Sequence, residues 1–320
     1  MVRYVAGRLG HALIVVWAAY TVSFLLLYAL PADPVSTMLS AGAVDGSTVS
    51  DADRAAIVAR FGFDQPLIVQ YLRMLGHLLT GDLGTSIQTG STVTTAIGAA
   101  LPSTLQLAAL AIVIGALVGI LVAFTANVVR SSVLRDVIFS VPPFLSAIPN
   151  FLIGLLLMWV FAFQLGVLPF RGSDGFEALI LPGLTLGLSL SARVGQVLGR
   201  DIQRELRTPY VDVLKVKSLS RPKIVMTHVF KNAGLPVLSV VGVMIGGLIA
   251  GTVITETIFA RPGIGRLLQL SVETQDFPVV QAIVVLSATT YAVVNLAADL
   301  VIPVVDPRLR RPGRARTKVE

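Results

Sequence analysis

Long runs of apolar residues, separated by short polar segments, make up most of this chain. Six of the runs match the ~20 residues that a helix needs to cross the hydrocarbon core of a bilayer. The pattern predicts spans at about residues 9–30, 102–127, 137–166, 178–199, 232–256 and 277–303. VPPFLSAIP interrupts the third span early. The expected architecture is an all-α membrane protein with six transmembrane helices in a single domain, residues 1–320.

Two longer polar segments separate these runs, at residues 31–100 and 200–231. In the first, Asp51 is expected to cap a short helix that ends at Arg60. Pro66 suits an early helical position, and the apolar residues after it recur on one helical face. We expect this second helix either to pack on the bundle or to lie at the membrane interface.

Composition supports the membrane assignment, since 54% of the residues are hydrophobic, only 13% are charged and the mean hydropathy is +0.81. Soluble domains are about a quarter charged. Nineteen of the 25 Lys and Arg residues fall on one side of the predicted topology. Basic residues gather on cytoplasmic loops, so both termini and segment 200–231 are expected in the cytoplasm, with the large 31–100 loop outside. The net charge of +7 then requires no nucleic acid.

Glycines four residues apart recur within the predicted spans. Such small-xxx-small pairs let helices approach closely. They favour a packed bundle over a loose set of anchors. The pairs are Gly115/Gly119, Gly183/Gly187, Gly242/Gly246 and Gly247/Gly251.

The sequence contains no pattern of catalytic chemistry. There is no cysteine, the three histidines are scattered, and no Gly-Lys pair exists from which a Walker-type ATP site could be built. Neither H-E-x-x-H nor G-x-S-x-G occurs. Glu256 and Asp299 lie near opposite ends of their spans and are poorly placed to act together. We therefore expect no catalytic residue, no metal site, no cofactor and no enzymatic activity in this chain.

The polar segment 200–231 has the pattern of two short helices. Thr208 followed by Pro209 is typical of a helix start, and Ser220 is expected to cap a second helix that leads into the fifth span. Tyr210, Val213 and Leu214 are expected to form an apolar stripe on the first helix. Periodicity alone leaves open whether a protein partner or lipid headgroups cover this stripe.

The stretch YVDVLKVKSLSRPKIVMTHVFKNAGLP resembles the cytoplasmic coupling loop of ABC-importer permeases. Further segments resemble the peptide and nickel branch of these permeases in the same order. They are RLGHALIVVW…LLYALPADP, FGFDQPLIVQYLRML…GDLGTSI, LPSTLQLA, ETIFARPGIGRLLQ, DFPVVQAIVV and DPRLR. The resemblance covers nearly the whole chain and is specific to the B-type subunit of dipeptide, oligopeptide and nickel importers.

This resemblance implies a type I ABC-importer permease fold in the bacterial inner membrane. It implies four kinds of partner: a second homologous permease, two ATP-binding subunits, an extracytoplasmic substrate-binding protein and the lipid bilayer. It also implies a coupling helix between spans four and five that docks on an ATPase. The residues of this coupling role would be Tyr210, Val213, Leu214, Lys217, Ser218 and Leu219.

The chain departs from the family pattern at two positions of the coupling helix. Leu214 stands where the family has Ala, and Ser218 where it has Gly. If position 218 adopts a positive φ, Ser would cost up to about 1 kcal/mol there.

A second set of residues is a candidate pathway or gate. Substrate contact and a purely structural role are both open for the residues near the external mouth, which include Arg261 and Arg266. Arg193 interrupts the shortest span and either snorkels to the cytoplasmic interface or lines the pathway. The candidates are Arg193, Glu256, Phe259, Pro262, Gly263 and Gly265.

The expected function is that of a permease subunit that forms half of the pathway of an ATP-driven importer for peptides or a similar small solute. The alternative is a secondary transporter or channel subunit that works without an ATPase. A membrane scaffold without transport is a third possibility. The sequence does not distinguish peptides, nickel chelates, glutathione and sugars as the cargo.

Overall fold

The computed structural model describes residues 2–29, 64–171 and 175–305. Within these ranges the chain is helical, with a single isolated bridge between Thr85 and Thr92 in place of any sheet. The helix predicted from Asp51 to Arg60 lies outside the described residues. The elements are α1 (Val2–Ala29), α4 (Leu67–Leu79), α5 (Val93–Val128), α6 (Ser132–Ala147), α7 (Asn150–Leu157), the π-helix η1 (Met158–Gln164), α8 (Glu177–Glu205), α9 (Pro209–Val216), α10 (Arg221–Ile224), the π-helix η2 (Val225–Val229), α11 (Phe230–Ala233), α12 (Leu235–Ile258), α13 (Ile264–Glu273) and α14 (Phe277–Val305).

Four helices among the described residues are long and apolar enough to cross a membrane. They are Ala6–Leu26 of α1, α5, α8 and Phe277–Ala297 of α14. A fifth candidate is the pair formed by α6 and the helix Asn150–Gln164, which is bent by 104°. The described part of the chain is therefore helical, with several helices that are long and apolar enough to cross a membrane.

The bend between α6 and α7 falls at Ile148 and Pro149. Pro142 and Pro143, near the start of the stretch VPPFLSAIP that was expected to interrupt the span, lie inside α6. Ile148 is extended, with φ −85° and ψ 125°, because the ring of a following proline disfavours the helical conformation. The break therefore falls within the predicted stretch VPPFLSAIP, at its C-terminal end.

The glycine pairs predict close contacts between helices, and the structure has such a contact along the seam between α5 and α8. A Cβ placed on Gly115 would lie 2.6 Å from Leu190 Cβ, and one on Gly119 would lie 2.8 Å from Val194. From the other side, a Cβ on Gly187 would lie 2.6 Å from Ile114. The close approach is confirmed for the pairs on α5 and α8. In contrast, Gly247 on α12 has no atom of the described chain within 4 Å.

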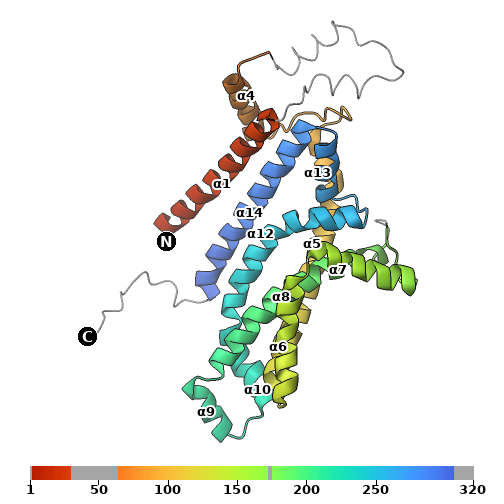
Figure 1. Ribbon diagram of the computed structural model, residues 1–320. Coiled ribbons are helices and arrows are strands. Elements are labelled where there is room, and N and C mark those ends of the chain that lie inside the picture. The colour runs from red at the N-terminus through yellow and green to blue at the C-terminus, as the bar shows by residue number, and fades with distance from the viewer. Residues whose placement is uncertain (1, 30–63, 172–174, 306–320) are drawn as a thin grey trace.

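The two ends of the molecule carry different elements. Figure 1 shows α9 at one end, α4 and α13 at the other, and α1 running antiparallel beside α14. The start of α1 and the end of α14 both point toward the end that carries α9. An even number of crossings would give this arrangement.

Helix α4 forms as predicted after Pro66 and rests on the end of α1. The Tyr20 hydroxyl donates to the backbone oxygen of Tyr71 over 2.8 Å, and the Tyr71 ring lies 5.1 Å from the Tyr20 ring and 5.3 Å from the Phe24 ring. Tyr71 therefore packs on the bundle. Five other apolar residues of α4 are exposed: Leu67, Ile68, Val69, Leu72 and Leu79.

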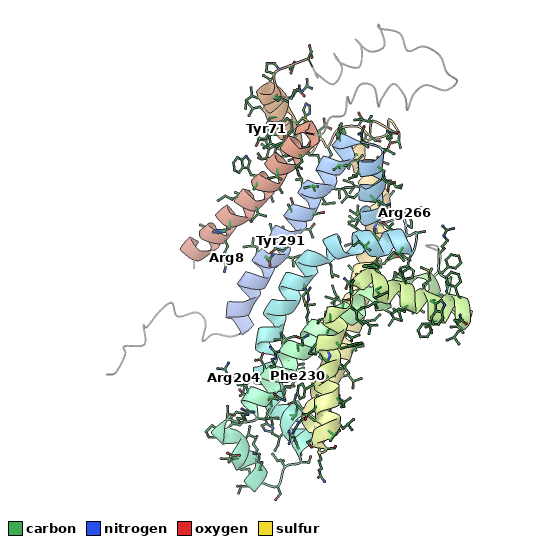
Figure 2. All side chains as sticks on the ribbon, viewed as in Figure 1. Arg8, Tyr71, Arg204, Phe230, Arg266 and Tyr291 are labelled. Carbon is green, nitrogen blue, oxygen red and sulfur yellow. The ribbon has the colours of Figure 1, made fainter. Side chains whose placement is uncertain are left out.

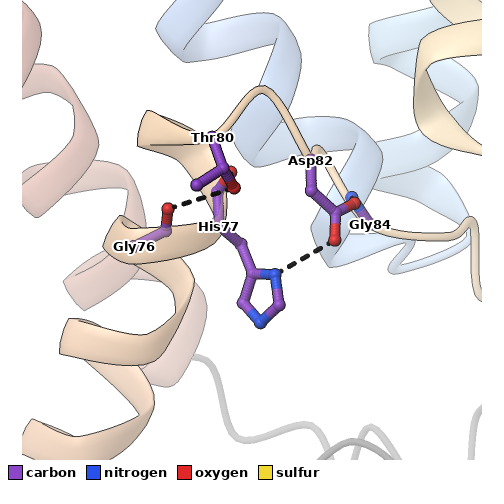
Figure 3. Close-up of polar contacts among 5 residues, drawn as sticks. All are labelled: Gly76, His77, Thr80, Asp82 and Gly84. Carbon is purple, nitrogen blue, oxygen red and sulfur yellow. Dashed lines mark hydrogen bonds and ion pairs between the residues drawn. The ribbon is translucent and has the colours of Figure 1, made fainter.

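A contact between His77 of α4 and Asp82 stabilises the turn that follows the helix (Figure 3). Asp82 Oδ2 lies 3.0 Å from His77 Nδ1, and Asp82 Oδ1 accepts a 2.9 Å hydrogen bond from the Gly84 amide. The Gly84 amide, and after it the His77 contact, lower the pKa of Asp82 below its ordinary value of 3.8. Both interactions stabilise the carboxylate form.

Candidate functional site

Helix α9 occupies the predicted position but begins differently from the prediction. Pro209 is the first helical residue, as expected. Thr208 makes no side-chain cap; its hydroxyl instead donates a 2.5 Å hydrogen bond back to the Glu205 carbonyl. Ser220 likewise makes no side-chain cap for α10. Both hydroxyl-cap predictions are therefore wrong, although both helix starts are correct.

The apolar residues of α9 divide between two faces. Val211 is 0% exposed and, with half-buried Leu214, packs into a hydrophobic cluster of the same chain. Tyr210, Val213 and Val216 are exposed, Val216 at 85%. The predicted stripe placed Leu214 with Tyr210 and Val213, whereas the structure turns it inward, because Val211 one turn earlier is already anchored on that side.

The cluster beneath α9, here called the α9 cluster, joins most of the elements at this end of the molecule. Its members come from α5, α8, α9, α10, η2, α11 and α12. The buried residues are Ala123, Val194, Leu198, Ile202, Val211, Ile224, Val225, Val229, Ala233, Val237 and Met244. Leu214 and Leu219 pack against its edge.

Ser218 ends α9 in a left-handed conformation, with φ +58°. The Ser218 amide donates to Lys215 O over 2.9 Å, and the Leu219 amide donates to Leu214 O over 3.3 Å. These two bonds form a Schellman motif, which normally places glycine at the left-handed position. The positive φ considered for this position is confirmed, and Ser stands where the backbone favours Gly.

Glu205, the last residue of α8, lies at the centre of a polar contact that the sequence reading did not anticipate. Its Oε1 accepts a 3.0 Å hydrogen bond from the Tyr210 hydroxyl and a 2.8 Å hydrogen bond from Asn232 Nδ2. Burial, followed by the Glu205 carboxylate, raises the pKa of Tyr210 above 10.0. The contact joins the ends of α8, α9 and α11. The only sign of this contact in the sequence was that Glu205 precedes Tyr210 by five residues.

A second unanticipated contact lies at the other end of this loop. Asn127, 1% exposed near the end of α5, donates through Nδ2 to Gly199 O on α8 over 3.2 Å. Its own backbone oxygen accepts a 2.7 Å hydrogen bond from Arg221 Nε. The start of α10 is therefore attached to the α5–α8 seam.

The α12–α13 junction, residues 256–266, lies toward the opposite end of the molecule. Figure 2 shows Arg266 there, whereas Arg204 and Phe230 lie toward the α9 end. Glu256 is 0% exposed. Its Oε1 accepts from Thr104 Oγ1 over 2.7 Å, and its Oε2 accepts from the Gly265 and Arg266 amides over 2.7 and 3.2 Å. The carboxylate thus caps the N-terminus of α13, where free amides favour an anion.

Two of the candidate glycines are required by this junction. A Cβ on Gly263 would collide with the Glu256 carboxylate, and one on Gly265 would collide with the backbone of Val253. The Thr104 hydroxyl also accepts a 2.8 Å hydrogen bond from the Ile264 amide. The structure therefore brings Glu256, Gly263 and Gly265 together, which the sequence suggested only by grouping them in one motif.

Arg261 is buried inside the same junction, at 1% exposure. Its Nη1 donates to Ala178 O over 3.3 Å, and its Nη2 donates to Ser103 Oγ over 3.2 Å. These bonds connect the junction to α5 and α8. The guanidinium is directed into the protein.

The remaining pathway candidates are dispersed. Phe259 is buried with Met158 and Leu181 in a separate apolar cluster. Pro262 lies within the junction and is exposed. Arg193 is exposed on α8, outside the junction. Any role of these three residues in a pathway stays a prediction.

Asp276, which the sequence reading also missed, fastens the turn between α13 and α14. Its carboxylate accepts from Ser86 Oγ over 2.5 Å and from the Ile87 amide over 3.1 Å. The loop before α5 is therefore attached to the α13–α14 turn across 190 positions of sequence.

Comparison with known proteins identifies the family. Residues 115–311 match the family described as the binding-protein-dependent transport system inner membrane component, and residues 1–108 match the corresponding N-terminal family. A dipeptide transport system permease protein of Lactococcus lactis is 32% identical, over 97% of this chain and 100% of its own length.

Two further relatives have similar coverage. A glutathione transport system permease protein of Salmonella paratyphi A is 30% identical, over 97% of this chain and 99% of its own. An oligopeptide transport system permease protein of Bacillus subtilis is 31% identical, again over 97% and 99%. The chain therefore belongs to the family of binding-protein-dependent transport system inner membrane components and is an ABC-importer permease of the dipeptide and oligopeptide type.

Proposed function

We propose that this chain forms half of the transmembrane pathway of an ATP-driven importer for peptides or a related small solute such as glutathione. A second permease would supply the other half, two separate subunits would hydrolyse ATP, and a binding protein outside the membrane would deliver the cargo. The cargo is proposed from relatives named for dipeptide, glutathione and oligopeptide transport.

We also propose the six-span topology, with both termini in the cytoplasm. The four helices that are long and apolar enough to cross a membrane, with the bent α6–α7 pair taken as one span, would supply five crossings. Helix α12, with 24 residues, is about 36 Å long and supplies the sixth. The side-by-side start of α1 and end of α14 support an even count. The bias of basic residues supports placing the α9 end in the cytoplasm.

The observation that carries the coupling role is the division of α9 into two apolar faces. Val211 and Leu214 hold the helix on the α9 cluster, and the opposite face presents Tyr210, Val213 and Val216 with no described residue covering it. Burying one such aliphatic side chain contributes about 1.5–3 kcal/mol. A groove on an ATPase subunit would cover this face, and the helix would pass its movement to the bundle through the inner face.

The α12–α13 junction is proposed as a structural joint of the permease. Glu256 has hydrogen-bond donors from its own chain at both carboxylate oxygens, and Arg261 is directed into the protein. Neither group is presented to a solute.

The coupling role is tested by charging the exposed face of α9. In the full complex reconstituted in lipid, Val213→Asp combined with Val216→Asp should reduce copurification of the ATPase subunit and abolish substrate-stimulated hydrolysis. Leu214→Asp is a poor test, because that residue packs inward and its change would disturb the α9 cluster itself.

The control is Val133→Asp, which places one new carboxylate on another exposed valine, at the start of α6, and so matches each single change in α9. It should leave assembly and import unchanged. Import that survives the double change in α9, or uptake that persists without any ATPase subunit, would overturn the proposal and favour a secondary transporter or channel.

A further inference from the structure

We propose that Glu205 is a positioning residue that ties movement of the coupling helix α9 to movement of α12. The inference rests on the proposed ATPase coupling and adds the residue through which that coupling would reach the bundle. Its basis is a single carboxylate oxygen that holds two separate elements.

The two hydrogen bonds of Glu205 converge on the same atom. The Tyr210 hydroxyl on α9 and Asn232 Nδ2 on α11 both donate to Oε1, over 3.0 and 2.8 Å. Glu205 itself is the last residue of α8. A displacement of α9 therefore either breaks the contact or moves α8 and α11 with it.

Asn232 stands at the entry to α12, because α11 ends at Ala233 and α12 begins at Leu235. Helix α12 then runs about 32 Å to Glu256, whose carboxylate accepts hydrogen bonds from Thr104 on α5 and from the Gly265 amide of α13. Polar joints thus lie at both ends of one helix. A push on α9 has a continuous route to the α12–α13 junction.

Apolar packing in the α9 cluster also joins these elements, but it does not fix direction. Burial of aliphatic side chains is favourable in proportion to contact area and is non-directional, whereas a hydrogen bond weakens steeply away from its preferred distance and angle. Bonds to a charged acceptor are about twice as strong as neutral ones. The Glu205 contact therefore fixes the orientation of α9 relative to α8, while the α9 cluster holds α9 against the helix bundle.

Tyr210 has two separate functions in this arrangement. Its exposed ring belongs to the outer face of α9, whereas its hydroxyl belongs to the Glu205 contact. The hydroxyl is protonated at physiological pH, as in an ordinary tyrosine, and its pKa is raised further by burial and the Glu205 carboxylate, so it remains a donor. Tyr210→Phe removes the donor and keeps the ring. This variant therefore distinguishes the role of the Glu205 contact from the role of the exposed docking face.

The test measures solute imported per ATP hydrolysed by the full complex in proteoliposomes. Glu205→Ala should lower this ratio at least about fivefold, the lower range of measured coupling between sites. Glu205→Gln should retain most of it, because the amide oxygen still accepts both bonds. Tyr210→Phe should lower it, and Glu205→Ala with Tyr210→Phe should be no worse than Glu205→Ala alone.

Asp136→Ala is the matched control, since among the described residues that carboxylate bonds to its chain neighbour Arg135 alone; its ratio should equal the wild-type value. An unchanged ratio in Glu205→Ala, or in Tyr210→Phe if Glu205→Ala does not assemble, overturns the inference. A Gln variant as impaired as the Ala variant also overturns it. If Val213→Asp with Val216→Asp abolishes coupling while Glu205→Ala does not, the inference fails and the proposed function stands.

Discussion

The hydroxyl of Thr104 on α5 donates a 2.7 Å hydrogen bond to the carboxylate of Glu256 on α12, across 152 positions of sequence. The same hydroxyl accepts from the amide of Ile264, the first residue of α13. One small side chain thus joins three helices, and both of its partners are buried in the described structure.

Thr104→Val should destabilise this junction. Valine matches threonine in shape but leaves Glu256 Oε1 without this donor and the Ile264 amide without its acceptor. Each buried group left unpaired costs about 1–3 kcal/mol. Thermal unfolding of the purified subunit in detergent should therefore begin at a lower temperature than in wild type. Thr104→Ser, which keeps the hydroxyl, should unfold close to wild type, and identical transitions for the Val and wild-type proteins would contradict the assignment.

Gly119→Ala should separate α5 from α8. The new methyl would lie 2.8 Å from Val194 and 3.0 Å from the Ser191 carbonyl, and overpacking of this kind costs about 1–3 kcal/mol. Gly98→Ala, on the same helix with no described atom within 4 Å, should be neutral or slightly stabilising because alanine favours helix. The same detergent unfolding assay should order the proteins with the Gly119 variant lowest. If both variants melt alike, the seam is looser than the structure shows.

Local features of the structure were predictable, whereas most long-range contacts were not. The starts of α4 and α9 follow from Pro66 and Pro209, because proline suits the beginning of a helix. The left-handed conformation of Ser218 was considered from its place at a helix end. Local patterns of this kind are set by residues a few positions away.

The contacts that the sequence did not reveal depend on tertiary packing. Glu205 meets Asn232 across 27 positions and Asp276 meets Ser86 across 190, and no periodicity connects such pairs. The inward turn of Leu214 depends on Val211 being anchored first. The glycine pairs could be listed from the sequence, but only the structure shows that, among the described residues, Gly119 has close neighbours and Gly247 has none within 4 Å.

Asp82→Asn should loosen the end of α4 in a pH-dependent way. The folded protein holds the pKa of Asp82 below 3.8, so the carboxylate contributes stability above about pH 3.8, which is lost as the pH falls through the folded pKa. At neutral pH the Asn variant should exchange the amide hydrogens of residues 77–84 faster than wild type. The difference should narrow as the carboxylate is protonated. A difference that does not change with pH would show that shape, and not charge, closes this turn.

Ser218→Gly should stabilise the end of α9. The left-handed conformation at φ +58° costs an L-residue about 1–2 kcal/mol. Replacing Ser218 by glycine removes this cost, but glycine loses more conformational entropy on folding, which offsets part of the gain. Amide exchange in α9 should slow in the variant, with a net gain below about 1 kcal/mol. Ser220→Gly is the matched control, because Ser220 is extended, with φ −68° and ψ 147°, and gains nothing from glycine. Slower exchange in both variants would point to a general effect of glycine in this loop. Slower exchange in Ser218→Gly alone would assign the strain to the one left-handed position that ends the coupling helix.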